Sequence, residues 1–97
     1  MPGSERENRI AAIVSEALTV LAVSEDEALS ILEGLLELDL SPAPSALRED
    51  ARAVYAAASV FFKSDHNGLL AFARLPLRSS HSAVRALSPL VLGEFAS

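Results

Sequence analysis

The chain has 97 residues, 51% of them hydrophobic and 22% charged, with a formal net charge of −5. This length suits one modest core, and the acidic balance disfavours nucleic-acid binding, which depends on clustered Lys and Arg. Because the sequence has no cysteine, it offers neither a disulfide framework nor a thiolate metal site.

The polar N-terminus is followed by an apolar run that Ser15 and Glu16 interrupt, which is not the form of a signal peptide. No stretch is long and apolar enough to span a membrane. We therefore expect a cytoplasmic protein without membrane insertion. An apolar fraction this large is hard to bury in so small a monomer, which favours binding to another protein.

A first helix is predicted from about Ser4 to Val23, with Ser4 as its N-cap and glutamates in its first turn. Its apolar residues recur with the period of an α-helix. One face carries Ile10, Ile13, Val14, Ala17, Leu18, Val20 and Leu21.

The pattern Ser24-Glu25-Asp26-Glu27 is typical of a capping box and predicts a second helix that ends at about Leu38. Its acidic residues lack the glycine and the alternating oxygens of a calcium loop, so we interpret them as helix-start charge. Apolar residues cover well over a third of the circumference of this helix, which must therefore be covered from more than one direction: Ala28, Leu29, Ile31, Leu32, Leu35, Leu36 and Leu38. Gly34 costs about 1 kcal/mol relative to Ala and indicates close packing.

The segment 39–45 contains Pro42 and Pro44, which exclude a helix there, and Ser45 is the expected cap of a third helix from Ala46 to Lys63. One side of that helix is a large apolar stripe: Leu47, Ala51, Val54, Tyr55, Ala58, Phe61 and Phe62. Its other side carries small residues, so a second helix can approach closely and cover it: Ala53, Ala56, Ala57 and Val60.

The turn 64–68 is expected to use positive φ at Asn67 and Gly68, and Ser64 or Asp65 can cap a fourth helix, Leu69 to Leu75. Pro76 ends that helix. A last helix begins near Ser80 or Ser82, and Pro89 either kinks it or starts a separate turn. Gly93 predicts a frayed tail through Phe95.

Five helices and no strand, joined by short turns, predict an all-α fold in which antiparallel helical hairpins stack. We expect a single helical domain over residues 1–97. Its N-terminal helix, residues 1–23, is a candidate partner contact, and residues 24–96 form the hairpins.

Two polar clusters could carry chemistry. Asp65-His66 is either an acid–base or ligand pair or turn chemistry, and we favour the turn. The serines around His81 are either a nucleophile with its base or helix caps, and we favour caps: Ser79, Ser80 and Ser82. We therefore predict no enzyme activity, no cofactor, no metal and no small-molecule substrate.

Four aromatic residues allow two interpretations, a core or a groove that accepts an amphipathic helix from another chain: Tyr55, Phe61, Phe62 and Phe72. Three arginines are either the rim of such a groove or ordinary surface charge, and surface charge is the favoured interpretation: Arg48, Arg52 and Arg74.

The segment Ala51–Lys63 with Gly68–Pro76 resembles a degenerate tetratricopeptide-repeat (TPR) hairpin. Preceded by Glu27–Leu38, it resembles the small TPR-like chaperones of bacterial type III secretion needle subunits, with an overlap from about Ser24 to Phe95. This resemblance implies a virulence-associated chaperone that holds the amphipathic C-terminal helix of the needle subunit in an apolar groove and prevents premature polymerisation. A second small helical co-chaperone would complete a heterotrimer.

On this resemblance, the residues expected to bind the needle helix are Leu36, Tyr55, Phe62, Leu69, Phe72, Leu87 and Leu90. Those expected to contact the co-chaperone are Ile10, Ile13, Val14, Ala17 and Leu21. The alternative from another class is a self-contained cytoplasmic adaptor or regulatory bundle, homodimeric through its first two helices. A small enzyme would need a buried polar cluster, which the sequence does not offer.

Overall fold

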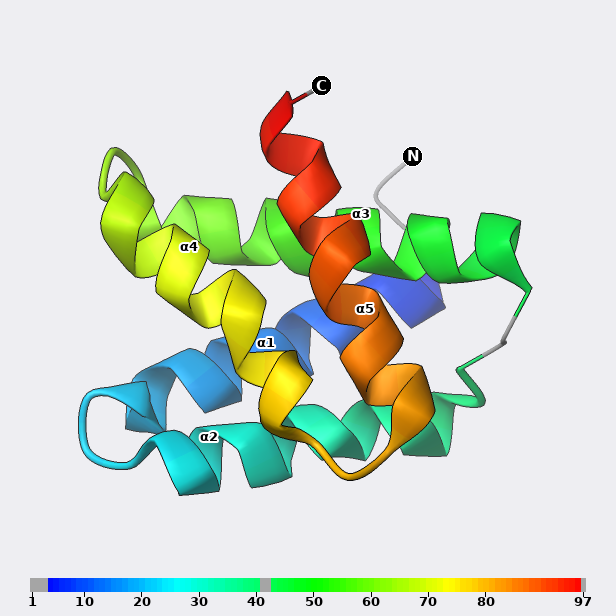
Figure 1. The fold of residues 1–97 in the computed structure, drawn as a ribbon, viewed down its shortest axis with the longest axis horizontal. Coiled ribbons are helices and arrows are strands. Elements are labelled where there is room, and N and C mark those ends of the chain that lie inside the picture. The colour runs from blue at the N-terminus through cyan, green and yellow to red at the C-terminus, as the bar shows by residue number, and fades with distance from the viewer. Residues whose placement is uncertain (1–3, 41–42, 97) are drawn as a thin grey trace.

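The expected helices are present in the computed structural model, which describes residues 4–40 and 43–96 (Figure 1). These residues contain five α-helices: α1 (Glu5–Leu21), α2 (Glu25–Leu32), α3 (Pro44–Phe62), α4 (His66–Arg74) and α5 (Ser82–Gly93). Three 3₁₀ helices extend α2, α4 and α5: η1 (Glu33–Leu38), η2 (Leu75–Arg78) and η3 (Glu94–Ala96). The described residues form no strand. The prediction of an all-α fold with five helices is confirmed.

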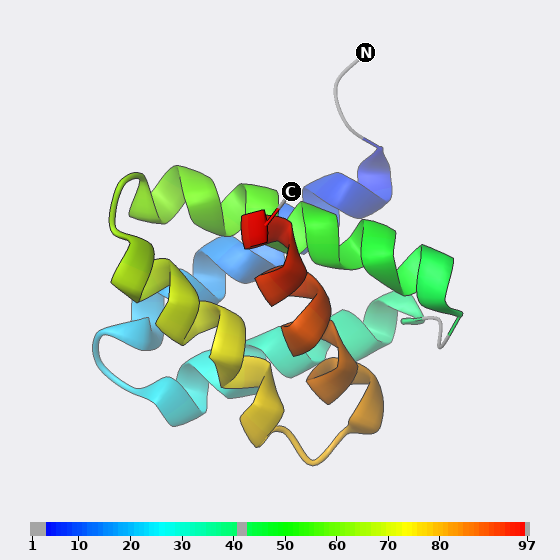
Figure 2. The same cartoon turned by 45° about the horizontal axis from the view of Figure 1, so that its top comes forward.

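The helices form two crossed groups around one core (Figures 1 and 2). α1 and α2 run antiparallel at the back, α4 and α5 cover the front, and α3 lies along the edge and contacts both groups. α5 also contacts η1, so the end of the chain returns to the opening hairpin. The principal extents are 31 × 30 × 24 Å, so the packed helices form a body nearly as wide as it is long.

The second helix changes type halfway, which the sequence did not indicate. α2 ends at Leu32, and η1 continues to Leu38 as a 3₁₀ helix. With about three residues per turn, residues three apart share one face. Leu32, Leu35 and Leu38 therefore all point into the core, with at most 6% of each exposed. Gly34 marks no close contact, since a Cβ there would meet nothing within 4 Å.

Three predicted helix starts are held by side-chain caps. Ser4 and Glu7 form a complete capping box. Ser24 accepts the backbone N–H of Glu27 at 3.2 Å, but its own N–H donates to the carbonyl oxygen of Val20, so only this half of the predicted capping box forms. Asp65 accepts the N–H of Gly68 at 3.0 Å, so of the two candidate caps for the fourth helix the carboxylate is the one used.

The start of α3 differs from the prediction. The helix begins at Pro44, and Ser45 lies inside it; the residue at the N-cap position is Ala43. Proline is favourable at the first helical position, because its missing N–H is unpaired there in any case and its φ suits the helix. The other proline of this segment, Pro42, lies outside the described residues.

The turn after α3 also uses different residues from those predicted. No described glycine has a positive φ; the positive values belong to Lys63 (φ 53°) and, after η1, to Asp39 (φ 54°), and of these two only Asp39 has the ψ of the left-handed helical region. α4 begins at His66, so Gly68 lies in its first turn. There a Cβ would lie 2.5 Å from Asp65 Oδ2 and 2.8 Å from the ring of Phe62. A glycine is needed at position 68 because Asp65 and Phe62 approach its Cα so closely, and not because the backbone there has a positive φ.

The C-terminal segment is packed, contrary to the expected fraying. Pro89 lies within α5, and η3 follows directly. The half-buried ring of Phe95 meets Tyr55 edge to face, with the ring centroids 5.3 Å apart. Ser88, which is fully buried, donates a hydrogen bond to the carbonyl oxygen of Ala73 at 2.6 Å and joins α5 to α4.

We predict that Gly68→Ala lowers the free energy of unfolding by about 1–3 kcal/mol, because Phe62 and the Asp65 cap must move aside. Gly34→Ala is the matched control and should be neutral or stabilising by about 0.5–1 kcal/mol, since its site is open. Urea unfolding followed by circular dichroism measures both variants. Equal effects at the two positions would contradict the close approach at Gly68.

Candidate functional site

A groove runs along the surface between α1 and α3. It is formed by two adjoining pockets of about 470 and 270 Å³, which share Glu7, Ala53 and Ala56. From α1 and its cap the groove is lined by Ser4, Arg6, Glu7, Asn8 and Ala11. From α3 it is lined by Glu49, Asp50, Arg52, Ala53, Ala56, Ala57 and Val60. We call this surface the α1–α3 groove.

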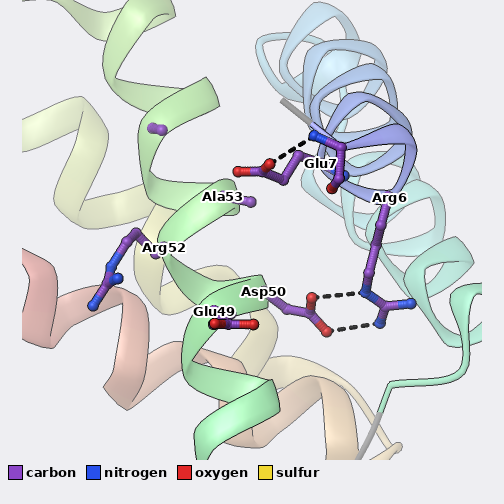
Figure 3. Close-up of a pocket in the computed structure, with 8 residues that line it drawn as sticks. Arg6, Glu7, Glu49, Asp50, Arg52 and Ala53 are labelled. Atoms are coloured by element: carbon purple, nitrogen blue, oxygen red, sulfur yellow. Dashed lines mark hydrogen bonds and ion pairs between the residues drawn. The ribbon is translucent and has the colours of Figure 1, made fainter. Parts of the chain in front are cut away.

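One end of the groove is closed by a paired arginine and aspartate (Figure 3). Arg6 donates from Nε to Asp50 Oδ1 at 2.8 Å and from Nη2 to Oδ2 at 2.7 Å. Its Nη1 donates to the carbonyl oxygen of Leu38. Only 8% of the Asp50 side chain is exposed, and its hydrogen bond raises the pKa of Arg6 above the ordinary value. The pair is a structural clamp that joins α1, η1 and α3.

The other end of the groove is apolar and open. Its floor is made of alanines, and Val60 at its edge is 76% exposed. The neighbouring Phe61 is 56% exposed and meets Phe62 edge to face, with centroids 5.1 Å apart. The small residues on this side of α3 predicted that a second helix approaches closely and covers it. In the structure no helix of the described chain covers Val60.

The residues predicted to hold a needle helix do not line the α1–α3 groove. Leu69, Phe72 and Leu87 are at most 3% exposed and belong to the core. The others are half-buried: Leu36, Tyr55, Phe62 and Leu90. A partner could contact the three buried residues only if the helices of this chain moved apart. Their role in partner binding stays a prediction.

Of the residues predicted to contact a co-chaperone, some are likewise buried and others are half-buried. Ile10, Val14 and Ala17 are at most 1% exposed, because α3 and α2 pack on that face of α1. Ile13 and Leu21 are half-buried. The apolar stripe of α1 is thus used first to hold the chain together, and its contact with a co-chaperone stays a prediction.

The aromatic residues and arginines that were considered for a groove differ in how exposed they are. Phe72 is core at 1% exposure, and Phe62 bridges it to the exposed Phe61. Among the arginines, Arg48 and Arg74 are exposed. Arg52 lies on the groove wall, with its Nε 3.6 Å from the Glu94 carboxylate.

The serine and histidine cluster after η2 has a structural role, but its serines are not the predicted caps: His81 occupies the N-cap position of α5, and no side chain caps this helix. The Ser79 hydroxyl donates to Glu33 at 2.6 Å and accepts the backbone N–H of His81 at 3.0 Å. Arg85 donates to the Ser79 carbonyl oxygen at 2.9 Å. The His81 ring is not the partner of the Ser79 hydroxyl, so the geometry has no nucleophile–base contact here. Nearby, Arg78 pairs with Glu25 and Asp26 at the start of α2.

Within residues 4–40 and 43–96, no three His, Asp or Glu side chains gather as metal ligands. Over the same residues no helix has the length and apolar character required to span a bilayer. No protein-family model, curated protein or solved structure matches the chain.

We predict that Arg6→Ala lowers the free energy of unfolding by roughly 2 kcal/mol, because it leaves the buried Asp50 carboxylate without its charged partner. Arg9→Ala, which removes an exposed arginine of the same helix, should change it by less than about 0.5 kcal/mol. Urea titration of the three proteins checks this. An Arg6 variant as stable as the Arg9 variant would show that the clamp contributes nothing.

Ser79→Ala should cost about 1 kcal/mol, since Glu33 loses a donor and the His81 amide loses an acceptor. Ser80→Ala, at the adjacent exposed position, should be near neutral. Thermal unfolding compares the two. A neutral Ser79 variant would remove the structural role assigned to this hydroxyl.

Proposed function

We propose that this chain is a protein-binding domain that receives an amphipathic helix of another protein in the α1–α3 groove. The observation that carries this proposal is the open groove itself, with an alanine floor and a valine 76% exposed at its edge. Alanines let a helix approach closely, and an exposed apolar side chain gives it a contact to bury.

The chemistry of the groove limits the partner. The shallow floor favours a helix with small residues facing α3, and Val60 favours an apolar side chain at that end. Glu49 at the other end, and Glu7, which lines both pockets, carry exposed carboxylates that favour Lys or Arg on the partner. The matching helix is therefore amphipathic, with small residues in its centre and a basic end.

We propose a specific partner for the groove on the basis of the sequence resemblance. Glu27–Leu38 and Ala51–Pro76 resemble the chaperones of type III secretion needle subunits, so the proposed partner is the C-terminal helix of such a subunit, held in the cytoplasm until export. A co-chaperone is proposed to bind through α1. Binding in the groove would cover a polymerising surface of the needle protein.

A second candidate is a self-contained adaptor, and the closed core favours it. The chaperone interpretation expects Phe72 and Leu87 to bind the partner helix. In the single chain both are buried, with only 1% of each exposed. A chain that buries its own large side chains need not depend on a partner to fold. The two candidates differ in the partner and not in the binding surface.

We predict that Val60→Glu abolishes binding of the C-terminal helix of a needle protein, because it places a charge where an apolar contact is needed. Val23→Glu is the matched control: Val23 is 85% exposed, lies outside the groove and should retain full binding. Co-expression with a needle protein, followed by size-exclusion chromatography with light scattering, measures complex formation.

Loss of the complex only in Val60→Glu supports the proposed surface. A complex equally stable in both variants places the binding surface elsewhere. No complex with any needle protein, from a well-folded wild-type monomer, overturns the secretion form and leaves the adaptor as the better interpretation.

A further inference from the structure

Lys63, which follows α3, has a backbone conformation that a lysine rarely adopts. Its φ of 53° and ψ of −113° lie outside the regions open to most L-residues. The backbone N–H of Asp65 donates to the carbonyl oxygen of Phe62 at 2.8 Å. These dihedral angles and this hydrogen bond are those of a type II′ β-turn, in which Lys63 takes the position that strongly favours glycine. The turn between α3 and α4 is therefore strained.

The helix that follows this turn begins weakly. Its first turn contains Asn67 and Gly68, which are both poor helix formers. With nine residues, α4 is also too short to be stable on its own. Its start depends on the Asp65 cap and on the Phe62 ring, which lies against Gly68. Both supports come from the strained turn.

The attachment of α4 to the core is smaller than that of its neighbours. α4 contributes three buried residues, whereas α1 contributes four and α3 five. α1 and α3 are also joined by the clamp of Arg6 and Asp50. At its other end α4 passes into η2 at Leu75, directly before Pro76, which cannot continue an α-helix. Both ends of α4 are thus natural points of bending, and α4 is held less firmly than α1 or α3.

We propose that residues 63–65 and α4 form a flap that opens locally while α1, α2 and α3 stay packed. Relaxation of Lys63 to an ordinary conformation favours the open flap, and burial of Leu69 and Phe72 favours the closed one. These two side chains are at most 3% exposed in the closed chain, and opening brings them to the surface. The flap does not rest on the proposed function, whose groove lies between α1 and α3.

Native-state hydrogen exchange on the full chain tests the flap. In the wild type we expect the amides of α4 to exchange through an opening at least about tenfold more frequent than the one that exposes the amides of α3. Lys63→Gly should lower the equilibrium constant of α4 opening by about fivefold, because relief of the strain exceeds the entropic cost of a glycine. Asp39→Gly is the matched control at the other described non-glycine residue with a positive φ, and it should leave α4 exchange unchanged.

The sequence has no cysteine, so a single introduced thiol gives an independent measurement. Ala73 on α4 and Ala58 on α3 are both at most 1% exposed. A thiol reagent should label Ala73→Cys at least about tenfold faster than Ala58→Cys. Addition of Lys63→Gly should slow the labelling of Ala73→Cys by about fivefold.

Two results would overturn the proposal. If α4 and α3 exchange with equal opening constants in the wild type, both helices open only when the whole chain unfolds, and there is no flap. If Lys63→Gly leaves the exchange of α4 unchanged, the strained turn is not part of the opening unit.

Discussion

The α1–α3 interface is fixed at one end by the ion pair between the half-buried Arg6 and the buried Asp50. Asp50 lies inside the chain at a point where an unpaired carboxylate would be costly, and the guanidinium of Arg6 satisfies both of its oxygens. The third donor of Arg6 binds the carbonyl oxygen of Leu38 at the end of η1. One side chain therefore sets the distances among three segments that are remote in sequence. Because the contact is bidentate, it also fixes the orientation of α1 against α3.

The groove is the consequence of that fixed spacing combined with small side chains. Ala53 and Ala56 extend only a methyl group from α3, so the clamp holds two helices at a distance that the alanines do not fill. The large residues of α3 face the opposite direction, where Leu47 and Val54 join the core. The two faces of α3 thus differ: the face with large side chains packs in the core and stabilises the fold, and the face with small side chains stays open to solvent.

Sequence reasoning succeeded where the signal is local. Helix number, the caps at Ser4 and Ser24 and the stop at Pro76 follow from side chains acting on their own backbone within a few residues. It failed where a distant contact decides. Arg6 and Asp50 are 44 positions apart, so neither helix pattern indicates their pairing. The space requirement at Gly68 depends on the Phe62 ring. The family resemblance assigned Leu69, Phe72 and Leu87 to partner binding, whereas they lie in the core of the single chain. An apolar side chain in a sequence does not distinguish burial in the core from burial against a partner.

A partner helix in the α1–α3 groove, as proposed above, gains most from Val60, because this residue is 76% exposed and its side chain leaves water on binding. The alanines of the floor allow close approach but contribute little apolar area of their own. The carboxylates of Glu7 and Glu49 contribute selectivity, because they favour a basic residue on the incoming helix and disfavour an acidic one.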